Sequence, residues 1–230
     1  MGIVDCEGQA TRAINTAIKA LIAAGETDIR VRHPAARHNL GVALTVPVRV
    51  TFEGSVGYYC GGMGDGPTVT VQGSAGWGLA EGIMSGMVIV EKNAGNGAGA
   101  AMRGGTVVVR GNASARAGIA MKGGTVIVGG KAGYMTGFMM QKGTIIILGD
   151  SGTALGDSLY EGRIFIAGAI GDLGNDAVLA ALSGDDERYL TETLAPFGYE
   201  AARYAFTKIV AGRKLWNFDK TDFATWKVAL

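Results

Sequence analysis

A repeat of 19 residues runs without insertion from Val50 to Gly168 and constrains the fold more than any other feature of the sequence. Most of the 39 glycines recur in register with this period. A fixed period near 20 residues is typical of a solenoid, in which each repeat buries its apolar face against its neighbours. Glycines at seven repeat positions are predicted to be structural, because the chain must turn or pack closely there: Gly76, Gly95, Gly99, Gly118, Gly133, Gly137 and Gly156.

Aliphatic residues keep the same register. One file of β-branched residues, that is, residues spaced 19 apart in the sequence, runs from Val69 to Ile164. A second such file lies two positions further along in every repeat. Residues two apart on a strand point to the same face, so each repeat sends two such side chains inward. A third apolar file, from Ile83 to Leu159, lies on another side of the repeat. We predict an all-β solenoid, namely a right-handed parallel β-helix with 19-residue rungs, and not a leucine-rich repeat, whose leucine frame is absent.

The regular repeat divides the chain into three predicted parts. Residues 1–49 are expected to form an N-terminal cap, with a helix over residues 7–24 and a strand over Thr27–Arg32 that pairs with or caps the first rung. Residues 50–171 form the β-helix. Residues 172–230 are expected to form a helical C-terminal cap with an aromatic tail, the helices covering residues 175–182, Asp186–Leu194 and Tyr199–Val210.

Composition indicates a cytoplasmic chain that is covered by partners. Charged residues make up only 18% of the chain, which leaves little charge for the surface of a free monomer. No apolar run approaches the length of a membrane span, and no secretory signal is visible at the N-terminus. Cys6 and Cys60 are far apart in the sequence and are expected to be reduced thiols.

Charge is distributed unevenly along the repeat. The stretch from Lys92 to Gly149 contains bases but no acid, whereas acids dominate from Asp172 to Glu200. A basic side can be solvated or can meet an acidic patch on another subunit. Nucleic acid is not expected, since no aromatic residues are interleaved with the bases and the net charge is only +1. The residues predicted to contact another subunit are Arg103, Arg110, Arg116, Lys122, Trp216 and Trp226.

The sequence offers no strong catalytic, cofactor or metal motif. The glycines from Gly95 to Gly99 imitate a dinucleotide-binding loop but precede a further strand instead of a helix. His33 and His38 lack an obvious third metal ligand. The acids near the exit of the coil, including Asp150 and Asp157, fit turn caps or the carboxylate pair of a β-helical polysaccharide enzyme. We therefore predict no catalytic, cofactor-binding or metal-binding residue in this chain.

Several motifs carry a resemblance to a known family. The glycine repeat, with Gly-Asn-Gly-Ala-Gly at 95–99 and Gly-Tyr-Met-Thr-Gly at 133–137, resembles the GXGXG β-helix domain of the glutamate synthase large subunit. The flanking stretches His33-Pro-Ala-Ala-Arg-His-Asn-Leu40, Gly54-Ser-Val-Gly-Tyr-Tyr-Cys-Gly-Gly-Met63 and Gly156-Asp-Ser-Leu-Tyr-Glu-Gly162 resemble its stand-alone form. That form is a subunit of N-methylglutamate synthase (methylamine–glutamate N-methyltransferase), and the resemblance covers nearly the whole chain.

The resemblance implies a structural subunit of a hetero-oligomeric flavoenzyme. Its expected partners are a class II glutamine amidotransferase-like subunit and a glutamate-synthase-like subunit that carries FMN and an iron–sulfur cluster. The complex would convert methylamine and L-glutamate to N-methyl-L-glutamate and ammonia, and the chain itself would hold no cofactor. Another amidotransferase or glutamate synthase complex, a subunit of formylmethanofuran dehydrogenase, and a self-sufficient polysaccharide enzyme are the alternatives.

Overall fold

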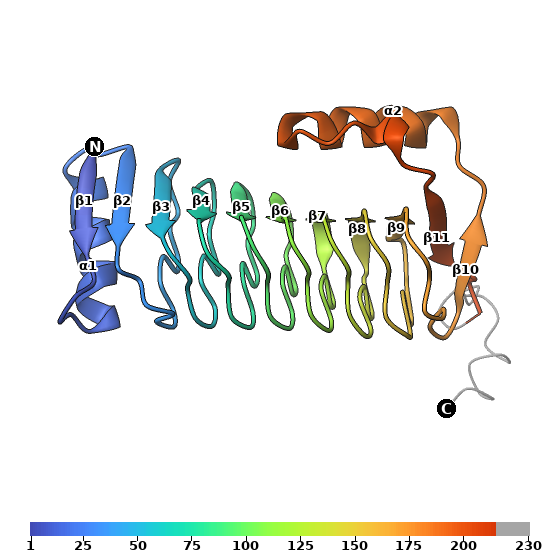
Figure 1. Ribbon diagram of the computed structural model, residues 1–230, viewed down its shortest axis with the longest axis horizontal. Helices are drawn as coiled ribbons and strands as arrows, with labels where there is room; N and C mark the ends of the chain where they lie inside the picture. Colours follow the sequence, from blue (N-terminus) through green and yellow to red (C-terminus); the bar gives the residue numbers. More distant parts are fainter. Residues whose placement is uncertain (215–230) are drawn as a thin grey trace, which may run out of the picture.

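The computed structural model, described here for residues 1–214, is an elongated coil of strands with helices near both ends (Figure 1). Eleven strands form one sheet in the order β1-β2-β3-β4-β5-β6-β7-β8-β9-β11-β10. From β1 to β9 each strand pairs in parallel with the next one along the chain, which is the pairing of a parallel β-solenoid. These strands are β1 Gly2–Asp5, β2 Asp28–Arg32, β3 Arg49–Glu53, β4 Thr68–Val71, β5 Met87–Val90, β6 Thr106–Val109, β7 Lys122–Val128, β8 Lys142–Ile147 and β9 Arg163–Ile166. The predicted parallel β-solenoid is confirmed.

The interior of the coil consists of the predicted apolar files. Val69 pairs with Val88 and Val71 with Val90, and the same pairing continues rung by rung to Ile164 and Ile166. These residues are at most 1% exposed, as are Ile83, Met102, Met121, Met140 and Leu159 of the third file. Because equivalent side chains stack directly above one another, each rung covers the apolar surface of the rung before it.

One corner of the coil is held by a ladder of short polar side chains. The Asn93 Oδ1 atom accepts the Asn112 N–H at 2.8 Å, and the Asn112 Oδ1 atom accepts the Lys131 N–H at 2.8 Å. The Ser55 hydroxyl and the Asp150 carboxylate accept the amides of the next rung in the same way, from Ser74 and Ala169. Side chains at this corner thus accept hydrogen bonds from backbone N–H groups that lie outside the paired strands.

The N-terminal end is closed by helix α1 (Thr11–Ala23), as predicted. Its side chains Ile14 and Ile18 are fully buried and belong to the same apolar core as the coil interior. Strand β2 pairs with β3 from Asp28↔Arg49 to Arg32↔Glu53, so the predicted pairing of this strand with the coil is also confirmed.

At the C-terminal end, one of the three predicted helices is present. It is helix α2 (Gly184–Leu194), which lies along the coil beside β6 to β9 (Figure 1). Its residues Leu190 and Leu194 pack in a second apolar cluster with Val108, Ile127 and Phe165 on the outer face of the sheet. Helix α2 thus covers one side of the coil.

The other two helix predictions are wrong. Residues 175–182 contain strand β10 (Ala177–Ala180). Tyr199–Val210 contains the short 3-10 helix η2 (Ala201–Arg203) and most of strand β11 (Thr207–Ala211), and another 3-10 helix, η1 (Ala195–Phe197), precedes this range. Strand β11 runs antiparallel to β9, and β10 pairs with its other edge. The last parallel strand, β9, offers unpaired backbone groups that β11 satisfies, and β10 in turn pairs with the outer edge of β11. The β-branched residues of β11 favour the strand conformation.

Candidate interaction surface

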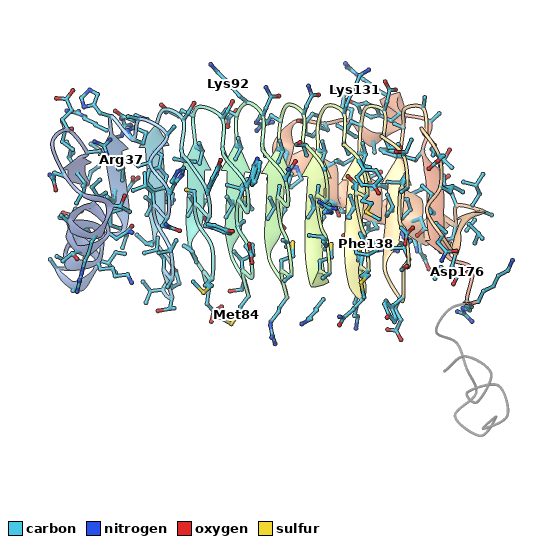
Figure 2. All side chains as sticks on the ribbon, turned by 90° about the horizontal axis from the view of Figure 1, so that it is seen from below. Arg37, Met84, Lys92, Lys131, Phe138 and Asp176 are labelled. Atoms are coloured by element: carbon cyan, nitrogen blue, oxygen red, sulfur yellow. The ribbon has the colours of Figure 1, made fainter. Side chains whose placement is uncertain are left out.

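Arg103 and Lys122 lie on one edge of the coil. Their amides donate hydrogen bonds to the carbonyls of Ile83 (2.8 Å) and Met102 (2.7 Å) on the preceding rungs, so backbone pairing holds the two residues next to each other. Met84 belongs to the same file, and Figure 2 shows it on the edge opposite Lys92. Strand pairing then places Lys142 opposite Lys122. We call Arg103, Lys122 and Lys142 the basic file.

The side chains of the basic file are accessible for binding an anionic group. All three side chains are exposed, and among residues 1–214 none of them forms an ion pair. By contrast, two other bases of the repeat, Arg110 and Lys131, pair with Glu91 and Asp150. Like charges stacked on adjacent rungs repel each other unless an opposite charge faces them. The arrangement expected for Arg103 and Lys122 is therefore present, while their contact with another subunit stays a prediction.

Arg110 has partners within the chain. Its guanidinium lies 3.0 Å from the Glu91 carboxylate, donates a hydrogen bond to the Phe197 carbonyl at 2.9 Å and lies 5.9 Å from the Tyr199 ring centroid. The structure thus places Arg110 where the C-terminal segment contacts the coil.

Of the remaining predicted interface residues, Arg116 lies within residues 1–214. Arg116 is exposed on a turn and lies 5.9 Å from the Tyr134 ring centroid. Trp216 and Trp226 lie outside the described residues. Within residues 1–214, backbone pairing thus brings together Arg103 and Lys122 alone of the predicted set.

A stack of exposed aromatic rings was not foreseen. The rings of His38 and Tyr58 stack at 4.3 Å between centroids, and those of Tyr58 and Trp77 at 5.3 Å. The His38 Nδ1 atom accepts the Tyr58 N–H at 2.9 Å, and Trp77 is 54% exposed. The 19-residue spacing between Tyr58 and Trp77 was the available signal, because residues one period apart stack on adjacent rungs. We call these three residues the aromatic ladder.

Two of the predicted structural glycines make room for this ladder. A Cβ atom on Gly76 would lie 2.6 Å from the Tyr58 Cδ1 atom, and a Cβ atom on Gly95 would lie 2.6 Å from the Trp77 Cδ1 atom. Each ring therefore covers the glycine of the next rung. Gly118 and Gly137 are required for another reason, since both have a positive φ and face the apolar core.

The acids near the exit of the coil have structural partners. The Asp157 carboxylate accepts the Ser158 hydroxyl at 2.6 Å and the Asn175 N–H at 3.1 Å. Asp150 lies 2.8 Å from the Lys131 ammonium group, and this contact together with the Ala169 amide lowers the pKa of its carboxyl. These contacts agree with the interpretation of the acids as turn caps.

One group of side chains has the composition of a metal site. Asp5, Glu7 and His33 lie together at the N-terminal end of the sheet, and all three are exposed. Hydrogen bonding to Asp5 raises the pKa of His33, whereas the Glu7 amide and then His33 lower the pKa of Asp5. Cys6 and Cys60 are buried free thiols, and burial raises the pKa of each.

These features define the molecule as a parallel β-solenoid with a basic file and an aromatic ladder on its outside. None of the helices in residues 1–214 has the length and apolar character needed to cross a membrane. No protein-family model matches the sequence. The chain is similar to Protein GlxC of Rhizobium meliloti (strain 1021), with 44% identity over 88 residues. The match covers 37% of this chain and 38% of Protein GlxC.

Proposed function

We propose that this chain is a structural subunit of a glutamate-synthase-like enzyme complex, and specifically of N-methylglutamate synthase. The similarity to Protein GlxC supports the coarser part of this proposal, a relationship to glutamate-synthase-like proteins. The flanking motifs around His33, Tyr58 and Gly156, which resemble the stand-alone subunit, support the specific complex.

The single observation that carries a structural role is the exposed, unpaired basic file on a rigid coil. Arg103, Lys122 and Lys142 are held in line by backbone pairing and have no acidic partner among residues 1–214. Electrostatic complementarity between subunits fixes their register and speeds their encounter. A regular coil presents such a row at a constant spacing, which suits a scaffold that positions other subunits.

In this proposal the chemistry belongs to the partner subunits. A class II glutamine amidotransferase-like subunit and an FMN and iron–sulfur subunit would be the partners. The complex would exchange methylamine and L-glutamate for N-methyl-L-glutamate and ammonia. The chain would place the two partners relative to each other.

The test is an affinity purification of the chain from its native host, followed by mass spectrometry, a flavin absorbance scan and an assay with methylamine and glutamate. Recovery of an amidotransferase-like protein and a yellow-brown flavoprotein, with formation of N-methylglutamate, is the expected result. A flavin complex that is inactive with methylamine would support another glutamate-synthase-like enzyme. Molybdenum or tungsten in the eluate, or a colourless chain recovered alone, would overturn the proposal.

A further inference from the structure

The parallel pairing of the first two strands brings together three residues that are far apart in the sequence. Asp5 is the last residue of β1 and pairs with Arg32, the last residue of β2, so His33 lies next to Asp5 beyond the end of the sheet. The hydrogen bond from the Cys6 amide to the Arg32 carbonyl, at 3.0 Å, continues this pairing by one residue. Glu7 follows in the turn after β1.

The three side chains converge on one point. The His33 Nδ1 atom lies 3.0 Å from Asp5 Oδ1 and 3.9 Å from Glu7 Oε1. One ligand atom from each residue lies within 4.8 Å of the other two. With metal–ligand bonds of about 2.1 Å, two adjacent ligands of an octahedral ion lie about 3.0 Å apart. Asp5 and His33 therefore already have the spacing of neighbouring ligands, and Glu7 reaches the same point by a side-chain rotation.

Local contacts hold the backbone around this point. The Asp5 carboxylate accepts the Glu7 N–H at 2.9 Å, and the Asp5 carbonyl accepts the Gln9 side-chain amide at 2.9 Å. The Arg37 guanidinium donates to the His33 carbonyl at 3.2 Å. The positions of the ligand-bearing residues are thus set by the sheet and its adjoining turns, while the side chains stay 48% (Asp5), 75% (Glu7) and 57% (His33) exposed.

The chemistry of the three groups selects a class of ion. An imidazole nitrogen with two carboxylates suits zinc and related divalent transition metals, whereas magnesium and calcium prefer oxygen ligands alone. Two carboxylates and a neutral imidazole supply the charge that a divalent cation needs. The nearby Arg32 is held 3.6 Å from the Glu53 carboxylate, so an acid outside the group already neutralises it.

We propose that Asp5, Glu7 and His33 bind one divalent transition-metal cation at the N-terminal end of the coil. Water completes its coordination, because the three protein ligands come from one exposed side. The competing state is the ion pair between Asp5 and a protonated His33, which a bound cation would replace. This site is independent of the proposed enzyme complex.

The test is calorimetric titration of the chelator-treated, tag-free chain with zinc chloride slightly above neutral pH, repeated with cobalt(II) and followed by absorbance. Wild-type chain is expected to bind about one ion, and His33→Gln, Asp5→Asn and Glu7→Gln should each weaken binding tenfold or more. His38→Gln is the matched control, because His38 is the other histidine of the chain and lies outside the group; its binding should equal that of the wild type.

Three results would overturn the proposal: no saturable binding, equal binding by the wild type and the Glu7→Gln variant, or a sulfur-to-cobalt charge-transfer band that places the ion on the neighbouring Cys6. Glu7→Gln makes the test decisive even if another variant fails to fold, because its exposed side chain has no contact in the core. Circular dichroism of each variant identifies any that is unfolded.

Discussion

The Lys208 ammonium group donates a hydrogen bond to the buried Asp186 carboxylate at 2.7 Å and thereby joins strand β11 to the first turn of helix α2. Arg163 of β9 donates to the other carboxylate oxygen at 3.0 Å, and the Ser183 hydroxyl and amide complete a capping box. Asp186 is only 2% exposed. One carboxylate thus holds the helix, the last parallel strand and the antiparallel extension together.

Replacing Asp186 by Asn should loosen helix α2 while the coil stays folded. The substitution leaves Lys208 and Arg163 facing a neutral amide, and breaking such a buried pair costs about 2 kcal/mol when the cations keep some contact with water. Amide hydrogen exchange in α2 should accelerate by roughly 30-fold, with little change in β4 to β6. Asp185→Asn is the control, because the Asp185 side chain is 82% exposed. Equal exchange in both variants would contradict this role for Asp186.

The same carboxylate should make the attachment of α2 sensitive to acid. Burial by itself would raise the pKa of Asp186, but the hydrogen bonds from Lys208 and Ser183 outweigh it and lower the pKa to about 2, against an ordinary value of 3.8. Because its pKa is lowered in the folded state, the Asp186 carboxylate stabilises the attachment of α2 fully above pH 3.8. This stabilisation is lost as the pH falls through about 2. The difference in α2 exchange between wild type and Asp186→Asn should therefore shrink over this interval. A difference that is constant down to pH 2 would contradict the assignment.

The sequence predicted the coil well because its signal is repeated on every rung. The course of the C-terminal segment was harder to predict, although one residue in each strand, between the two inward-pointing side chains, indicated where this segment covers the sheet. This residue points outward and is Thr51 in β3 and Thr70 in β4, but Val108, Ile127 and Phe165 in later strands. The change from threonine to large apolar residues marks where α2 covers the sheet.

The candidate sites depended on contacts that no local pattern reveals. The Asp5, Glu7 and His33 group requires the parallel register of β1 and β2, and the contact of Arg110 with the Phe197 carbonyl joins residues 87 apart. The file containing Arg103 and Lys122 could be predicted, because both residues obey the 19-residue period.

Substituting Gly118 by Ala should destabilise the coil by about 2 to 4 kcal/mol in chemical denaturation. Gly118 has a φ of +67°, and a Cβ atom there would lie 2.6 Å from the Ile145 Cδ1 atom. Gly8→Ala isolates the cost of the positive φ from that of the steric clash. Gly8 has a φ of +66° but no atom within 4 Å of the added Cβ, so this substitution should cost about 1 kcal/mol. Adding Ile145→Val, which removes the crowding methyl group, should recover part of the Gly118→Ala loss. If the effects of Gly118→Ala and Ile145→Val on the free energy of unfolding were additive, the steric clash would be ruled out.

Replacing Trp77 by Ala should weaken capture of partner subunits with little loss of stability. Trp77 ends the aromatic ladder and is 54% exposed, and exposed aromatic rings are enriched among the side chains that anchor interfaces. A loss of roughly tenfold or more in affinity is expected if the ring is buried by a partner. Leu179→Ala is a suitable control, since Leu179 is 59% exposed but lies in β10 at the other end of the sheet. Equal capture by the two variants would exclude the aromatic ladder from the interface.

Reversing the charge of Arg103 and Lys122 together, by substitution with Glu, tests the basic file. Both side chains are exposed and have no ion-pair partner in residues 1–214, so the variant should melt within a few degrees of the wild type. If an acidic surface faces the file, the reversal replaces attraction by repulsion, and the affinity for partners should fall about tenfold or more, with a weaker salt dependence.

The matched control for this double reversal is Lys19→Glu with Lys92→Glu, which changes the net charge equally but on helix α1 and on the opposite edge of the coil (Figure 2). Size-exclusion yield of the complex at low and high salt distinguishes the two variants. Equal loss in both would mean that net charge alone governs assembly, because a local contact depends on where the charges lie and not on their sum. Unchanged yield in both would show that the basic file faces solvent in the complex. Loss confined to Arg103 and Lys122 is the outcome that the geometry of the basic file predicts.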